Sequence, residues 1–84
     1  MSSVQDRVIA IVAEQLRVPA DDVSPSSHLL DDLNADSLDV VDLTIAIEEA
    51  FSTDDNEIEI SEDAAAEMRT VQDILKFLDE HGAA

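Results

Sequence analysis

The apolar residues near the start of the chain recur with the period of an α-helix. Five of them share one face at the i, i+4, i+7, i+8 and i+12 spacing: Val4, Val8, Ile11, Val12 and Leu16. Ser2 and Gln5 fit a capping box at the start of this segment, and Pro19 is expected to stop it. The pattern therefore predicts a first helix over residues 4–16.

Residues 18–36 have no helical period and contain two prolines within a Ser- and Asp-rich stretch. The apolar residues along this stretch indicate a loop that is pinned to the core: Val23, Leu29, Leu30 and Leu33. Loops of this length are uncommon unless they are functional. We therefore predict a long first loop with a functional role.

Helical periodicity returns at Ser37, and Asp36 is placed to act as an N-cap for a second helix over residues 37–51. The next stretch, S-T-D-D-N-E at 52–57, breaks the pattern and is typical of an exposed acidic turn. I-E-I at 58–60 alternates as a strand does, but nothing elsewhere in the sequence offers a partner strand. We therefore expect no sheet.

Two short capping patterns follow in the last third of the chain. Ser61 is expected to cap a short helix that reaches about Met68, and Thr70 with Asp73 begins a last helix that Gly82 ends. Its buried stripe is expected to be Val71, Ile74, Leu75 and Leu78. The prediction is an all-α fold: one domain over residues 1–84, a small four-helix bundle with a short third helix and a long first loop.

The second helix is amphipathic in two ways. At about 100° per residue, one arc forms a core face: Val40, Leu43, Ile47, Ala50 and Phe51. A second apolar strip, made of Leu38, Val41 and Ile45, lies beside Glu48, and a separate acidic row contains Asp39, Asp42 and Glu49. A small bundle cannot easily bury both apolar strips. We therefore expect the second strip to stay partly in water and to serve as a docking surface.

Charge narrows the classes of partner. The 84 residues include 21 acidic and 4 basic side chains, for a formal net charge of −17. Nucleic acid and anionic membrane surfaces are disfavoured because binding them requires Lys and Arg. Basic protein patches are the favoured partners, and divalent cations can bind loosely to the acidic clusters.

Other compositional features bear on location and packing. The chain has no Cys, which excludes disulfides and thiolate metal sites, and its N-terminus lacks both a basic region and a long apolar run. We expect a reducing, cytoplasmic location. Aromatic residues make up only 2% of the chain, so the core must be aliphatic.

Ser37 is the residue with the clearest chemical interest. It falls in the first turn of the second helix, where free backbone N–H groups and the helix dipole favour an attached phosphate. From position alone, the simpler interpretation is an ordinary helix-start serine, because Ser is common there.

The sequence around Ser37 changes that balance. D-D-L-N-A-D-S-L-D-V-V-D-L at 31–43 resembles the phosphopantetheine attachment segment of the acyl carrier protein family. The resemblance continues through I-A-I-E-E-A-F at 45–51, I-E-I-S-E-D-A-A-A at 58–66 and T-V-Q-D-I at 70–74, and so covers nearly the whole chain.

The resemblance implies that Ser37 carries a covalent 4′-phosphopantetheine arm, transferred from coenzyme A by a magnesium-dependent phosphopantetheinyl transferase. The arm's thiol would carry acyl groups as thioesters between enzymes, and the protein itself would catalyse nothing. The resemblance also implies a monomer with a partner-recognition surface: Asp36, Leu38, Asp39, Val41, Asp42, Ile45, Glu48 and Glu49. By resemblance and stripe position, an acyl chain would enter the core along Leu43, Ile47, Met68, Val71 and Ile74.

The chain departs from the family pattern in two places. Asn34 stands where many members have Gly, but Asn can also adopt a left-handed turn. The stretch 52–57 is longer than the usual turn after the second helix. This difference affects expectations about partner contacts there and leaves the modification site unchanged.

Other classes of protein are less consistent with the sequence. A serine hydrolase would need a nucleophile elbow and an oriented His, whereas His28 and His81 lie in a loop and at the C-terminal end. An EF-hand starting at Asp54 fails because Ile58 occupies the fifth position and no Gly occupies the sixth. An acidic interaction module without a prosthetic group remains an alternative.

Within the carrier class, the start at Met1 favours a free-standing carrier of dissociated fatty acid synthesis, with a polyketide or peptide-pathway carrier as the alternative.

Overall fold

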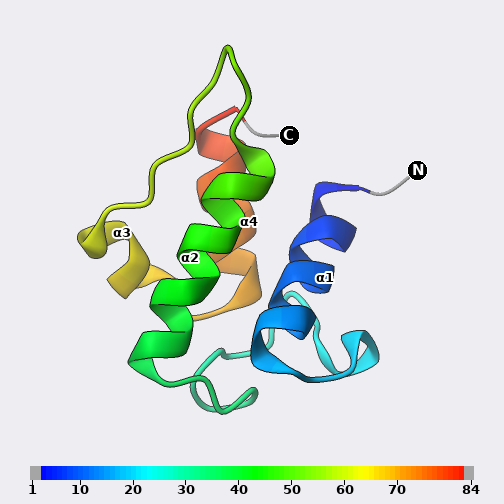
Figure 1. The fold of residues 1–84 in the computed structure, drawn as a ribbon. Helices are drawn as coiled ribbons and strands as arrows, with labels where there is room; N and C mark the ends of the chain where they lie inside the picture. The colour runs from blue at the N-terminus through cyan, green and yellow to red at the C-terminus, as the bar shows by residue number, and fades with distance from the viewer. Residues whose placement is uncertain (1–2, 83–84) are drawn as a thin grey trace.

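The computed structural model describes residues 3–82. Within them the chain forms four α-helices and one 3-10 turn (Figure 1): α1 (Val4–Leu16), η1 (Ala20–Asp22), α2 (Ser37–Phe51), α3 (Glu62–Glu67) and α4 (Val71–Glu80). Among these residues no strand forms, and the single isolated β-bridge joins His28 to Thr70. The predicted all-α class, with a short third helix and a long first loop, is confirmed.

Side-chain caps set where the helices begin. Asp36 and Thr70 open α2 and α4 with full capping boxes, and Ser61 caps α3 by accepting the Ala64 N–H. At α1 the cap is Ser3, whose hydroxyl oxygen accepts the Asp6 N–H at 3.1 Å. The capping role predicted for Ser2 falls on a residue outside the described part of the chain.

The first helix has the predicted bounds, but Pro19 is not what ends it. The helix ends at Leu16 because Arg17 takes a left-handed conformation with φ 58°. The Val18 N–H then donates to the Ala13 carbonyl oxygen at 3.0 Å, which satisfies an end carbonyl of the helix. Pro19 therefore follows a helix that has already ended.

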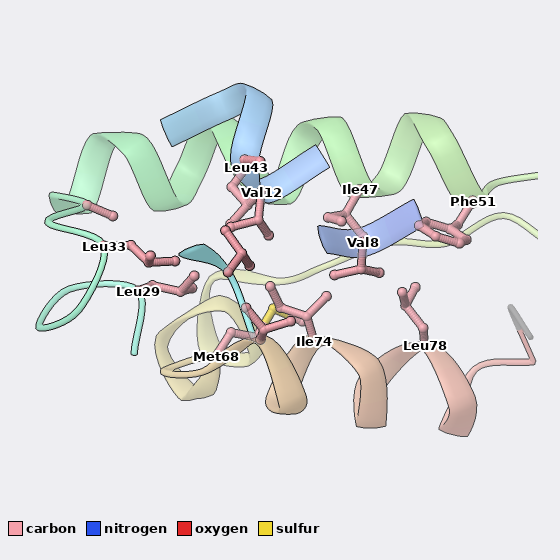
Figure 2. Close-up of a cluster of buried hydrophobic side chains, with 14 of the residues drawn as sticks. Val8, Val12, Leu29, Leu33, Leu43, Ile47, Phe51, Met68, Ile74 and Leu78 are labelled. Atoms are coloured by element: carbon pink, nitrogen blue, oxygen red, sulfur yellow. The ribbon is translucent and has the colours of Figure 1, made fainter. Parts of the chain in front are cut away.

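The core lies between α1, α2 and α4, and α1 packs against both of the other helices. Figure 2 shows α2 and α4 facing each other across the buried side chains, with Met68 and two loop leucines closing one end. The buried apolar residues are Val8, Val12, Ala13, Val23, Leu29, Leu33, Ala35, Leu43, Ile47, Phe51, Ile58, Met68, Val71, Ile74 and Leu78. Nearly all are aliphatic, as the composition requires.

Some individual predictions about burial were wrong. Leu30 was assigned to the core, but 55% of its surface is exposed while its neighbour Leu29 is completely buried. The two side chains diverge because the chain turns at this point, with Leu29 paired to the segment before α4. Leu75, assigned to the buried stripe of α4, is only partly buried.

Backbone hydrogen bonds hold the long first loop against the start of α4. The Leu29 N–H donates to the Arg69 carbonyl at 2.9 Å, and the Val71 N–H donates to the Ser27 carbonyl at 3.2 Å. The Gln72 N–H donates to the Pro25 carbonyl at 2.8 Å. This pairing positions the loop immediately before α2.

The segment after α2 leaves the bundle, turns back and runs beside α2 to reach α3 (Figure 1). Its exposed acidic turn is confirmed, and Asn56 ties it to the end of α4 by donating from Nδ2 to the His81 carbonyl at 2.9 Å. Ile58 is buried and Ile60 is partly buried, whereas Glu59 is exposed. The alternation at 58–60 thus reflects packing on the core rather than a strand.

Candidate functional site

The site is organised around the start of α2. Asp36 and Asp39 form a reciprocal cap, in which the Asp36 carboxylate accepts the Asp39 N–H at 2.8 Å and the Asp39 carboxylate accepts the Asp36 N–H at 3.2 Å. Asn34 just before them takes φ 58°, the left-handed turn expected of it. Ser37 follows as the first residue of the helix, and it is exposed to solvent.

A pocket of ≈ 490 Å³ opens beside Ser37. Three parts of the chain form it: the first loop, the first turns of α2, and α3 with the residues after it. The lining residues are His28, Leu30, Asp31, Ser37, Val40, Val41, Glu62, Ala65, Ala66, Met68 and Arg69. We call this pocket the Ser37 groove.

The Ser37 groove combines apolar walls with one basic residue, Arg69, and two acidic residues, Asp31 and Glu62. Leu30, Val41 and Met68 belong to its apolar lining, and Arg69 is one of only four basic residues in the chain. The apolar part of this lining suits an extended, uncharged chain. The sequence alone did not indicate Arg69 as a residue of the site, because its place in the groove depends on the pairing between the first loop and the start of α4.

The second apolar strip of α2 is exposed. Leu38, Val41 and Ile45 expose 67%, 49% and 47% of their surfaces. Leu30, which the sequence placed in the core, joins these residues as an exposed large hydrophobic side chain. The expectation that this strip stays partly in water is confirmed, whereas its role in docking stays a prediction.

The acidic residues expected at the partner surface have different local roles. Asp42 and Glu49 are exposed. Asp36 and Asp39 cap the helix with the same carboxylates that would face a partner. Glu48 is partly buried, and its Oε2 atom accepts the Ile60 N–H at 2.8 Å.

The residues expected along the acyl path lie in the core. All five are buried: Leu43, Ile47, Met68, Val71 and Ile74. Met68 is the member of this set that also lines the Ser37 groove. The groove and the core therefore meet at Met68, and the path beyond it stays a prediction.

Further features of residues 3–82 concern the Ser37 hydroxyl, metal-binding clusters, His81 and membrane spans. The hydroxyl of Ser37 has no hydrogen-bond partner there, and no group of three or more His, Asp or Glu side chains could hold a metal ion. His81 lies at the end of α4, with its Nδ1 atom 2.8 Å from the Phe77 carbonyl oxygen. No helix in this part of the chain has the length and apolar character needed to span a membrane.

This small helical bundle presents an exposed serine at the start of a capped helix, beside a groove with apolar walls, and these are the features of a carrier domain. Residues 6–78 match the family described as "Phosphopantetheine attachment site". The chain is 46% identical over 79 residues to an acyl carrier protein of Chlamydia trachomatis serovar L2, covering 94% of this chain and 96% of the relative. It is also 46% identical over 74 residues to an acyl carrier protein of Helicobacter hepaticus, covering 88% of this chain and 91% of the relative.

The chain belongs to the acyl carrier protein family, as its sequence indicated. It is a carrier and not an enzyme, and its cofactor is a covalently attached 4′-phosphopantetheine. Membership also implies interaction with a phosphopantetheinyl transferase and with acyl-processing enzymes. The interaction-module alternative, which lacks a prosthetic group, is thereby set aside.

Proposed function

We propose that Ser37 is the residue that carries the 4′-phosphopantetheine arm. The observation that carries this proposal is the exposed position of Ser37 at the start of α2, directly beside a groove with apolar walls. In the transfer, the Ser37 Oγ atom forms the new bond to phosphorus and 3′,5′-ADP leaves coenzyme A. The base must come from the transferase, because Ser37 has no hydrogen-bond partner within residues 3–82.

The residues around Ser37 suit each part of the arm. A phosphodiester on Ser37 would lie at the N-terminus of α2, where the helix dipole and free backbone N–H groups favour negative charge. Arg69 would offer the one positive charge in a lining that also holds Asp31 and Glu62. The apolar portions of the arm would contact the groove walls formed by Ala65, Ala66, Val40 and Val41. The thiol at the far end then carries the acyl group as a thioester.

The surface that receives partner enzymes is proposed to be the exposed strip of α2 with Leu30 and its acidic neighbours. Leu38, Val41 and Ile45 supply the apolar contact area, while Asp42 and Glu49 supply exposed negative charge. Desolvated aliphatic contacts with a charged rim are a common interface design. A net charge of −17 would speed encounter with basic patches on those enzymes.

The pathway is proposed to be dissociated fatty acid synthesis in the cytoplasm, with the protein acting as a monomer. Support comes from the two relatives, which are named simply as acyl carrier proteins and are covered almost end to end. The modified protein should therefore support chain elongation when it is mixed with purified bacterial enzymes of dissociated fatty acid synthesis. Failure with these enzymes would contradict the pathway while leaving the attachment site untouched.

Peptide mass spectrometry tests the attachment site directly. The protein is incubated with coenzyme A, magnesium and a broad-specificity transferase, and the adduct is then mapped. We expect one phosphopantetheine on Ser37 and none on a Ser37→Ala variant. Modification that persists in this variant, or that maps to Ser24, Ser26 or Ser27, would disprove the assignment.

A further inference from the structure

Glu48 differs from the other acidic residues of α2 in what its carboxylate contacts. It lies in the second half of the helix, is partly buried, and accepts the Ile60 N–H through Oε2 at 2.8 Å. Ile60 is itself partly buried and packs against the core. This hydrogen bond joins residues twelve positions apart and links α2 to the segment that leads into α3. Glu49, the next residue, is exposed and has no such contact among the described residues.

Helix α3 has little anchorage of its own. None of its six residues is buried, and α2 is the helix it packs against. Buried side chains hold the chain only on either side, at Ile58 before the helix and Met68 after it. Figure 1 shows α3 set off from the three longer helices, at the end of the segment that runs beside α2.

Hydrogen bonds on either side of α3 also hold the chain: the Ile58 N–H donates to Ser52 Oγ at the end of α2 at 2.9 Å, and the Arg69 N–H donates to the Asp73 carboxylate of α4 at 3.0 Å. Within the described part of the chain, residues 61–68 hydrogen-bond among themselves and to the residue that follows them, where the Arg69 N–H donates to the Glu67 carbonyl oxygen at 3.0 Å. The Ile60 N–H bond to Glu48 is therefore the one hydrogen bond that ties residues 59–68 to another helix. Because α3 supplies Glu62, Ala65 and Ala66 to the Ser37 groove, its position sets one wall of that groove.

We propose that Glu48 is a positioning residue that holds α3 against α2 through the Ile60 N–H and thereby sets the width of the Ser37 groove. Its main task is then to accept a hydrogen bond, in contrast to the exposed acids Asp42 and Glu49. The effect of the Glu48–Ile60 hydrogen bond on the position of α3 does not depend on the phosphopantetheine arm. Its consequence for how the groove receives that arm rests on the proposed attachment at Ser37.

Two substitutions separate accepting a hydrogen bond from carrying a charge. Glu48→Gln removes the charge and keeps a side-chain oxygen that can accept from Ile60, although the neutral bond is weaker. Glu48→Ala removes both. Glu49→Gln and Glu49→Ala make the same chemical changes at the adjacent exposed position and serve as matched controls. Circular dichroism establishes that each variant folds.

The main measurement is amide hydrogen exchange of the unmodified protein, followed residue by residue by NMR. In Glu48→Ala we expect exchange at Ile60 to accelerate roughly tenfold, with faster exchange through α3, because a hydrogen bond to a charged group is lost. In Glu48→Gln the exchange should stay within about threefold of the wild type. Both Glu49 variants should match the wild type in exchange at Ile60 and through α3.

The second measurement is the KM of the transferase for each variant, read together with the NMR shifts of Ala65 and Ala66. We expect Glu48→Ala to raise KM more than Glu48→Gln does, and to shift these two signals, which Glu48→Gln should leave in place. The proposal is overturned if Glu48→Ala leaves the exchange at Ile60 unchanged. It is also overturned if the Gln and Ala variants lose protection at Ile60 equally, or if they raise the KM equally. A wild type that is never modified would refute the attachment site and leave the exchange result intact.

Discussion

At the scale of single residues, Asp36 has one role that the structure shows and a second that we propose for the same carboxylate. It caps α2 by accepting the Asp39 N–H at 2.8 Å, and it lies next to Ser37, the proposed attachment site, where it would attract the transferase. The two roles need different properties of the side chain. Capping needs an oxygen acceptor, which Asn also has, whereas attraction to a basic enzyme needs the negative charge.

Replacing Asp36 in two ways should separate these roles. Asp36→Ala should lower the free energy of unfolding by about 0.5–2 kcal/mol because it removes the cap, and Asp36→Asn should change it by only a few tenths. Both variants should slow association with the transferase, since both lose the charge. Urea unfolding measures the first effect and stopped-flow kinetics the second. Equal destabilisation by Asn and Ala would contradict the capping argument.

At the scale of the element, α2 divides its apolar residues between the core and the surface. Leu43 and Ile47 are about 99% buried, whereas Ile45 between them exposes 47% of its surface. Removing a side chain from each face should therefore have opposite consequences for folding and for binding. The exposed acids Asp42 and Glu49 add charge to the surface face, and within residues 3–82 neither carboxylate accepts a hydrogen bond.

Alanine substitutions on the two faces of α2 test this division. Leu43→Ala should cost about 2–5 kcal/mol of stability through the cavity that it leaves. Ile45→Ala should change stability by less than about 0.5 kcal/mol, as surface substitutions usually do, but should weaken binding to an acyl-processing enzyme. Thermal unfolding and calorimetric titration provide the two measurements. An Ile45→Ala variant that binds as well as the wild type would remove the strip from the docking surface.

Charge reversal on α2 should act on the rate of encounter. Asp42→Lys with Glu49→Lys should slow association with a basic partner enzyme, and wild-type association should slow as salt rises, because the Debye length is only about 8 Å at physiological ionic strength. The control is Asp21→Lys with Asp22→Lys in η1, which makes the same change in net charge at another exposed site. Stopped-flow measurement of both pairs distinguishes local recognition from total charge. Equal slowing by both pairs would argue against a specific surface on α2.

At the scale of the whole molecule, the composition of the core bears on where an acyl chain goes. Phe51 is the one aromatic residue among the buried side chains of the described part, so the core can rearrange by small movements of aliphatic groups. Met68 lines the Ser37 groove and also belongs to the core. We therefore propose that a chain carried on Ser37 enters the core past the flexible side chain of Met68.

Acyl chains of increasing length should stabilise the modified protein up to a limit. Each methylene removed from water contributes about 0.8 kcal/mol before the opening of the core is subtracted. Ile47→Phe should shorten the preferred chain by filling the path, whereas Ile45→Phe on the exposed face should not. Thermal unfolding across an acyl series gives the measurement. A flat series, with no shifts at the Leu43 and Ile74 methyls, would place the chain in solvent.

The helices could be predicted closely because their signals are local. Periodicity and the caps at Asp36, Ser61 and Thr70 involve residues within one or two turns of each other, so the bounds of α2 were predicted to the residue. The stretch 18–36 was less predictable. Its apolar residues did not reveal that Leu29 would be buried and Leu30 exposed, because that difference follows from backbone pairing with Arg69.

The sequence by itself determined the class of fold, the helix boundaries and the serine at the start of α2, because each depends on neighbours within a few residues. Only the tertiary structure decided that Arg69 lines the groove beside Ser37 and that Glu48 is bonded to Ile60. It also decided that Leu30 belongs to the surface. These features depend on contacts between segments distant in the chain. A one-dimensional pattern carries no record of which distant segments meet, because that is settled by how all the apolar faces pack together.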